Sequence, residues 1–328
     1  MDALVRKHLA RALLVSALVS GGLSASAAPP LLTPSTCTVE TMLVDVRAAL
    51  KDGSPALRRY VKVRLREAAL ALPVAELQAA LEREREPEVL EALGAALATK
   101  ASHAESPTLV QPLLARAAGD ADPAARAAAV RALRATPSVE FMAKNGGVVT
   151  YEQLARDSSP EVRRAVADNL IEESAQVYSG HDRAVSETAV AVASSTEDPA
   201  VAAKLLGEIS MEAVGHEAVE RVTGHLKSED PGLRAAAATA LGGVPGAEAT
   251  GARRSLEEAF RRDSNPAVRK AALEGIARLG QSSARPLLES LRGVDASMDL
   301  EIDAWLSALK LNLQEWHLLL REKQRLRR

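Results

Sequence analysis

Five arginines are the residues of this sequence whose type and spacing suggest a chemical task, the binding of negatively charged groups. They are Arg59, Arg66, Arg131, Arg134 and Arg164. A guanidinium group binds a carboxylate or a phosphate through a planar fork of donors. If the segments that hold these arginines are helices, we predict a surface that binds an acidic protein segment or an anionic envelope polymer. The alternative is that all five are ordinary solvated residues.

Histidine offers a second candidate chemistry, because His216 is followed directly by Glu217. An iron site in a protein needs several imidazole and carboxylate ligands that converge. After the first 27 residues, the other histidines have no glutamate directly behind them: His103, His181, His225 and His317. The sequence also lacks a glycine-rich phosphate loop, a GxSxG nucleophile motif and a Cys–His pair. We therefore predict no catalytic residue, metal site, cofactor or bound small molecule.

The elements that must position the arginines are marked by seven prolines at intervals of 32 to 39 residues. They are Pro55, Pro87, Pro123, Pro160, Pro199, Pro231 and Pro266. Six of the seven preceding residues are Ser, Asp or Asn, whose side chains accept hydrogen bonds from the first turn of a helix. Proline itself is favoured at the first helical position, where its missing N–H would have no partner. Each proline therefore predicts the start of a helix.

The residues after each proline predict which face of that helix is buried. Positions two, six and ten past the proline are apolar in all seven copies, a spacing typical of one buried helical stripe. Positions four, eight and eleven avoid that stripe, and the five arginines occupy such positions. A second amphipathic segment precedes each proline, so each copy of about 35 residues is a helical hairpin. One hairpin cannot bury both of its helices, so the copies must stack.

The end of the chain is predicted to cap the stack. An eighth, degenerate copy follows the seventh, and a last helix at about 313–328 ends in basic residues that suit the negative end of its dipole. The residues predicted in the buried stripe of the eighth copy are Leu300, Ala304 and Ala308. We expect Trp305 and Trp316 to serve core packing there. Within the repeats, we expect an irregular point at Asn145-Gly146-Gly147.

This pattern resembles the HEAT family, in particular the short bacterial HEAT-like repeats of the phycobilisome-lyase type. The strings that carry the resemblance are DADPAARAAAVRAL from Asp120, SSPEVRRAVADNL directly after Asp157, SEDPGLRAAAATAL from Ser228 and DSNPAVRKAALEGIARLG from Asp263. The resemblance implies an all-α fold, a right-handed, armadillo-like α-solenoid (superhelix) of stacked hairpins. It covers roughly residues 38–310 and implies little about function, since repeat scaffolds carry unrelated roles.

The same resemblance implies a ladder, in which an arginine early in the second helix reaches turn groups of its own or an adjacent repeat. The matching arginines are Arg58, Arg126, Arg163, Arg234 and Arg269. The matching turn acids are Asp52, Asp120, Asp157, Asp230 and Asp263. Leu90 and Ala202 replace the arginine in the second and fifth copies, so we expect the ladder to be interrupted there.

The first 27 residues are predicted to be a secretory signal peptide. A basic start leads into an apolar run at 12–19, and Ala25-Ser26-Ala27 is a small-x-small cleavage pattern. The run is shorter than the roughly 20 residues of a spanning helix, although a retained anchor is the alternative. We expect cleavage after Ala27 and a periplasmic or secreted protein. The predicted organisation is 1–27 signal peptide, 28–37 linker, 38–296 seven repeats and 297–328 degenerate copy with capping helix.

Composition narrows the function. Removing residues 1–27 changes the formal net charge from −2 to −4, because three basic residues and Asp2 leave with them, and only 2% of all residues are aromatic. We therefore expect no nucleic-acid partner, and the single cysteine, Cys37, excludes an internal disulfide. We predict an exported scaffold, not an enzyme, that binds a protein through the concave side lined by its second helices. The alternative is a HEAT-like enzyme of the lyase or metal-dependent hydroxylase type.

Overall fold

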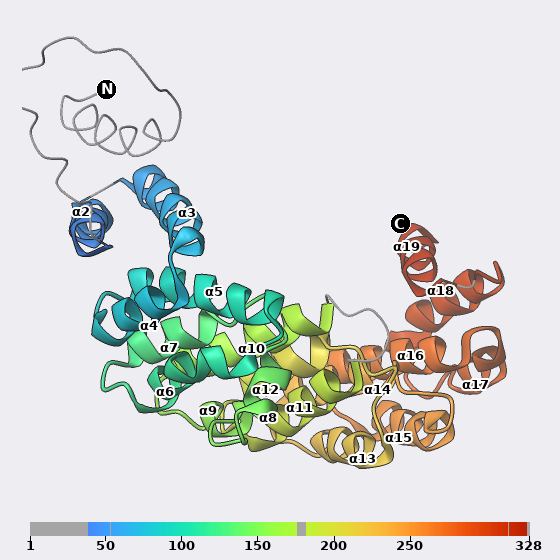
Figure 1. Cartoon of the computed structure of the whole chain (residues 1–328). Coiled ribbons are helices and arrows are strands. Elements are labelled where there is room, and N and C mark those ends of the chain that lie inside the picture. The colour runs from blue at the N-terminus through green and yellow to red at the C-terminus, as the bar shows by residue number, and fades with distance from the viewer. Residues whose placement is uncertain (1–38, 53, 176–181, 314, 327–328) are drawn as a thin grey trace, which may run out of the picture. The chain divides into compact units, whose positions relative to one another are not determined.

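The computed structural model describes residues 39–52, 54–175, 182–313 and 315–326, and within these ranges it contains helices and no strand. The chain divides into two compact units, Met1–Thr41 and Met42–Arg328. The second unit holds the helices described below, apart from the first residues of α2. Figure 1 shows these helices in chain order. The predicted signal peptide, the linker and Cys37 lie outside the described residues.

Each of the seven prolines is the first residue of a helix, as predicted, and we call these the second helices of their hairpins. They are α3 (Pro55–Ala71), α5 (Pro87–His103), α7 (Pro123–Arg131), α10 (Pro160–Ala175), α12 (Pro199–Glu208), α14 (Pro231–Leu241) and α16 (Pro266–Gly280). Side chains that accept a hydrogen bond from a first-turn N–H are those of Ser54, Asp122, Ser159, Asp198, Asp230 and Asn265. These N–H groups have no partner inside the helix, so the caps explain where the helices begin.

A first helix precedes each second helix. The first helices are α2 (Val39–Asp52), α4 (Val74–Arg83), α6 (Gln111–Gly119), α8 (Ser138–Lys144) with α9 (Tyr151–Leu154), α11 (Asp182–Ser195), α13 (His216–His225) and α15 (Ala249–Arg262). The fourth is divided into α8 and α9 at Gly146 and Gly147, whose φ angles of 78° and 62° favour glycine. The predicted irregular point is therefore confirmed.

A buried polar cluster fastens the divided first helix of the fourth hairpin, α8 with α9, to its second helix α10. The Glu173 carboxylate accepts hydrogen bonds from the backbone N–H and the hydroxyl of Ser138, at the start of α8. The Tyr151 hydroxyl of α9 donates to Ser138 Oγ at 2.6 Å, and Asn169 Nδ2 donates to the carbonyl of Val130 at 2.5 Å. Burial raises the pKa of Glu173. The cluster thus fixes the short helices α8 and α9 to α10.

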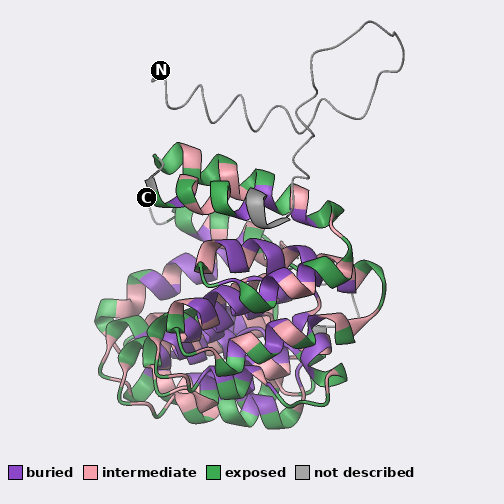
Figure 2. Ribbon diagram, turned by 60° about the vertical axis from the view of Figure 1, so that its left-hand side comes forward, coloured by how far each residue is buried: buried purple, intermediate pink, exposed green. Residues whose placement is uncertain are grey.

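The second helices pack on one another, α3 on α5, α12 on α14 and α14 on α16. Leu97, Leu133 and Leu241, ten residues past their prolines, are fully buried, and each contributes about 2 kcal/mol to stability. Between α14 and α16 a Cβ at Gly242 would lie 2.7 Å from Gly275 Cα, so the backbones touch. Figure 2 shows buried positions running along the stacked helices and exposed positions on the outside. This is the core of an α-solenoid, built mainly from Leu, Val and Ala.

The arginine ladder joins successive hairpins. Arg126 donates through Nη1 to the carbonyl of Asp120 in its own turn, at 2.8 Å. Its Nε and Nη2 donate to the carboxylate of Asp157 in the next turn, at 2.7 and 2.8 Å. The same link to the next turn joins Arg163 to Asp198 (3.2 Å), Arg234 to Asp263 (2.6 Å) and Arg269 to Asp295 (2.8 Å). Each rung therefore ties one hairpin to its neighbour.

The two predicted interruptions have different outcomes. At Leu90, arginines of first helices take over. Arg47 of α2 pairs with Glu84 of the second turn at 2.8 Å. Arg116 of α6 donates to the carbonyls of Leu81 and Glu84 at 2.8 and 2.9 Å. At Ala202 nothing replaces the rung: within the described ranges, no side chain of α12 forms an ion pair or hydrogen bond with the turn at 228–230.

The C-terminal end consists of α17 (Arg285–Ser290), α18 (Asp299–Leu309) and α19 (Trp316–Leu326). Trp305 of α18 stacks on Trp316 of α19, with ring centroids 5.3 Å apart. Lys323 of α19 forms a buried ion pair with Glu301 of α18, both side chains being 5% exposed. Core packing by the two tryptophans is thus as predicted. We call these four residues the α18–α19 clasp.

One predicted buried residue of this end was wrong. Ala304 and Ala308 are buried, but the side chain of Leu300 is 80% exposed. The reason is that α19 packs against α18 and centres its buried face on Trp305. Five residues earlier on a helix lies about 140° away. Leu300 is therefore turned to the outside.

Candidate partner-binding surface

Positions four, eight and eleven past each proline form a continuous set on the second helices, which we call the second-helix surface. They lie opposite the buried stripe, at about 20° to 80° on a helical wheel on which the stripe spans about 200° to 280°. Large side chains at these positions are exposed or half-buried, whereas small ones such as Ala98, Ala127 and Ala277 are covered by neighbouring helices. The surface therefore carries the polar side chains that a partner would meet.

Two of the five predicted arginines are engaged by neighbouring helices. Arg131 of α7 donates to Glu91 of α5 at 2.8 Å. Arg134 follows α7 and lies 3.2 Å from Glu172 and 3.7 Å from Asp168, both of α10. Exposed pairs of this kind contribute about 0–1 kcal/mol each. Their main effect is to neutralise the positive charge of two arginines that, from the sequence alone, we predicted to bind a ligand.

The same kind of pairing is found beside this surface, on α3 and α12. Lys62 of α3 lies 3.2 Å from Glu88 of α5, and Lys204 of α12 donates to Asp168 of α10 at 2.5 Å. The surface from α3 to α12 is therefore a row of alternating charges, not a uniformly basic one. Sequence analysis did not find these pairs, because they join residues about 26 to 40 positions apart whose helices had first to be placed.

The other three predicted arginines remain available. Arg59 and Arg66 of α3 and Arg164 of α10 are exposed, and among the described residues none of them forms an ion pair or a side-chain hydrogen bond. Their guanidinium groups keep all their donors for solvent or for a ligand. The structure therefore divides the predicted set into two paired and three unpaired arginines.

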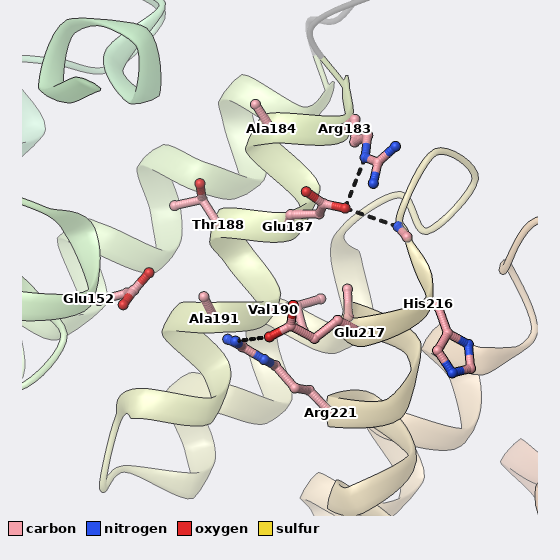
Figure 3. Close-up of a pocket in the computed structure, with 12 residues that line it drawn as sticks. Glu152, Arg183, Ala184, Glu187, Thr188, Val190, Ala191, His216, Glu217 and Arg221 are labelled. Carbon is pink, nitrogen blue, oxygen red and sulfur yellow. Dashed lines mark hydrogen bonds and ion pairs between the residues drawn. The ribbon is translucent and has the colours of Figure 1, made fainter. Parts of the chain in front are cut away.

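A groove on the first-helix side is a separate feature (Figure 3). It has a volume of about 470 Å³ and lies among α9, α11 and α13. Glu187 Oε1 accepts from Arg183 Nε and from the Gly215 N–H, both at 3.0 Å, and Arg221 donates to Glu217 at 2.6 Å. Most charges that line the groove thus satisfy one another. Of these residues, sequence analysis had singled out only the pair at 216–217.

His216 stands at the edge of this groove, and its side chain is exposed. Its Nδ1 lies 2.9 Å from Glu248 and its Nε2 3.3 Å from Glu220. The hydrogen bond with Glu248, the charge of that carboxylate and the charge of Glu220 raise the pKa of His216. Within the described ranges, no three His, Cys, Asp or Glu side chains are grouped as metal ligands. His216 is therefore placed as a surface charge partner.

The part of the chain that the structure describes contains no helix long and apolar enough to cross a bilayer. No family model and no curated protein sequence matches this chain.

Three solved structures resemble it in fold. One is importin beta, with 13% identity over 82% of this chain and a TM-score of 0.51. A structure of Kap95p and RanGDP has 14% identity over 85% of this chain and a TM-score of 0.47. An engineered protein has 17% identity over 87% of this chain and a TM-score of 0.37. This chain covers 40% of the importin beta chain, 40% of the Kap95p chain and 98% of the engineered one. The importin beta match shows the fold and confirms the predicted class: the chain is an all-α solenoid of HEAT-like helical repeats.

Proposed function

We propose that this protein is a non-enzymatic scaffold that binds a protein partner through its second-helix surface. The observation that carries the proposal is the set of exposed, unpaired arginines on that surface, Arg59, Arg66 and Arg164. Elsewhere on the surface, basic side chains have acidic neighbours. An acidic group of another molecule can bind such an unpaired cation without first breaking an ion pair inside the fold.

The test is chemical cross-linking of the protein in native envelope fractions, followed by identification of the captured protein. The variant changes Arg59, Arg66 and Arg164 to glutamate. The matched control changes Arg254, Arg261 and Arg262 of α15 to glutamate, which alters the net charge equally on a first helix. We expect the native protein and the control to capture the same partner and the variant to lose it. Equal capture by all three would exclude the second-helix surface.

We also propose that the protein is exported and that residues 1–27 are removed. The support is the basic start, the apolar run and the Ala25-Ser26-Ala27 pattern of the sequence. Expression of the full chain in a bacterium, with fractionation and intact-mass measurement, tests this directly. The expected product begins at Ala28 and is found outside the cytoplasm. A product that begins at Met1 and stays in the cytoplasmic fraction would refute export.

The alternative is an enzyme on the same scaffold, a lyase of the phycobilisome-lyase type or a metal-dependent hydroxylase. A hydroxylase of that kind would need several His–Glu pairs, and this chain contains one, at 216–217. His216 already has two carboxylate neighbours that hold it at the surface. Metal analysis of the purified protein separates the proposals: stoichiometric iron or zinc would favour the enzyme.

A further inference from the structure

The second helix of the first hairpin, α3, differs from the other second helices in what it exposes. Arg59, Val63, Arg66 and Leu70 stand four, eight, eleven and fifteen residues past Pro55, a spacing that puts them on one face. Val63 is 58% and Leu70 38% exposed. Cationic and apolar side chains thus alternate along one exposed stripe, which we call the α3 stripe.

An aromatic ring extends the stripe on one side. Tyr60 is 46% exposed and lies next to Val63 on the helical wheel. Within the described ranges, α3 carries three of the exposed large hydrophobic residues, more than any other helix. Large apolar side chains gathered on one exposed face mark binding surfaces more often than scattered ones do.

The acidic residues near the stripe are already engaged. Glu67 of α3 accepts from Arg64 at 2.6 Å, and Glu88 of α5 lies 3.2 Å from Lys62. In the part of the chain that the structure describes, Arg59 and Arg66 form no ion pair, whereas Arg131 and Arg134 do. The stripe therefore combines exposed apolar surface with uncompensated positive charge.

We propose that the α3 stripe is the docking site for an acidic amphipathic helix of the protein partner, an inference that rests on the proposed scaffold function. Apolar residues spaced three or four apart on that helix would pack on Val63, Leu70 and Tyr60. Carboxylates beside them would bind the guanidinium forks of Arg59 and Arg66. One turn of helix rises about 5.4 Å, so cationic and apolar groups recur on both helices at matching intervals.

Two other occupants fit the stripe less well. A nucleic acid or an acidic polysaccharide would use the arginines but gain nothing from Val63 and Leu70. The C-terminal helix α19 of a second copy exposes Arg321 and Arg325, so its surface charge opposes docking on Arg59 and Arg66. Apolar side chains between the two cations favour a folded, acidic peptide segment.

The experiment selects, from a displayed library of random 16-residue peptides, those that bind the full-length protein. Every position of the library can hold acidic, basic, polar or apolar residues. Enriched peptides are synthesised, labelled and titrated by fluorescence anisotropy. We expect acidic peptides with apolar residues three or four apart, and affinity that falls about tenfold or more in the R59E/R66E variant. The V63S/L70S variant should weaken the same peptides about fivefold or more and leave heparin binding unchanged.

The controls separate this inference from the scaffold proposal. An α15 variant that changes only Arg254 and Arg262 to glutamate alters the net charge as much as R59E/R66E does, and it should bind the peptides as the native protein does. Circular dichroism should show each variant folded. Peptides that bind the native protein and both α3 variants with equal affinity would overturn the docking site but would not contradict the scaffold function. Enrichment of basic peptides would also overturn it. So would a result in which R59E/R66E weakens the binding of the peptides and of heparin equally, while V63S/L70S weakens neither. Enrichment of no peptide anywhere would count against both proposals.

Discussion

The two ends of the stack of hairpins use the same kinds of side chain in opposite ways. At the C-terminal end, Lys323 is buried against Glu301, and its ammonium lies 4.6 Å from the ring centroid of Trp305. At the N-terminal end, the cations Arg59 and Arg66 and the ring of Tyr60 face outward. Cationic and aromatic side chains form a buried contact at one end and exposed surface at the other.

The difference follows from what the chain supplies to each end. A repeat at the end of a stack has no further repeat to cover its outer residues. At the C-terminal end α19 provides that cover. Among the described residues, nothing equivalent pairs with the α3 stripe. The two ends therefore make opposite predictions: changes in the clasp should affect stability, and changes in the α3 stripe should affect binding.

The largest expected effect is that of Trp305→Ala. The ring is fully buried and stacked on Trp316, so its removal leaves a cavity and should lower the free energy of unfolding by about 3–5 kcal/mol. Urea denaturation followed by far-ultraviolet circular dichroism measures this. Tyr60→Ala is the matched change in α3 and should cost less than about 1 kcal/mol. Similar costs for both variants would break the comparison.

Lys323→Met should follow, because it leaves the Glu301 carboxylate buried without its cation. Breaking a buried pair on one side costs about 3–5 kcal/mol, and the Met side chain recovers part of this by packing. Trp305 and Trp316 are the chain's two tryptophans, so intrinsic fluorescence reports directly on the clasp. The double variant Lys323→Met/Glu301→Leu should regain stability. No recovery in the double variant would mean that the ion pair is not what the clasp depends on.

A rung of the ladder should have an intermediate effect. Arg126→Ala removes two hydrogen bonds to Asp157 and one to a carbonyl, and we expect a loss of about 2 kcal/mol. Arg66→Ala removes an arginine of α3 with no ion pair in the described part of the chain and should change stability by less than about 0.5 kcal/mol. Equal losses in urea unfolding would show that Arg66 has a structural partner.

The smallest effect is one of pH. The hydrogen bond from Arg126 holds the pKa of Asp157 below its ordinary value, as Arg234 does for Asp263. A depressed folded-state pKa adds stability above the unfolded pKa of about 3.9, and this is lost as the pH falls through the folded value. The native protein should therefore lose stability below about pH 4 more steeply than Arg126→Ala. Parallel curves would contradict this role of the rung.

Much of the fold could be predicted from the sequence because the same helical pattern occurs in it seven times. Each proline with its capping neighbour marks one helix start, and the four-residue spacing marks one buried face. The ladder rungs to Asp157 and Asp263 followed from the family resemblance. Leu300 was misplaced because the eighth copy is unique, and the packing of α19 that rotates its buried face cannot be inferred by repetition.

The candidate site was predicted only in outline. Helical spacing placed the arginines on the correct side of their helices. Which of them are neutralised depends on contacts between helices, and Arg131 and Arg59 look alike until Glu91 is placed beside one of them. The acceptors Asp198 and Asp295 were missed for a related reason. Asp198 stands two residues later in its turn than Asp157 does, and Asp295 lies just before the degenerate copy, where the repeat pattern is lost.

The direction of the ladder has a consequence for the order in which the chain is made. In each rung formed by a second-helix arginine, the arginine comes before the aspartate it binds, with sequence separations of 31, 35 and 29 positions for Arg126, Arg163 and Arg234. During synthesis the arginine of each hairpin is therefore made first, and its contact forms once the turn of the next hairpin, which carries the aspartate, has been synthesised. No rung depends on a distant part of the chain, so the repeats can fold one after another behind the ribosome.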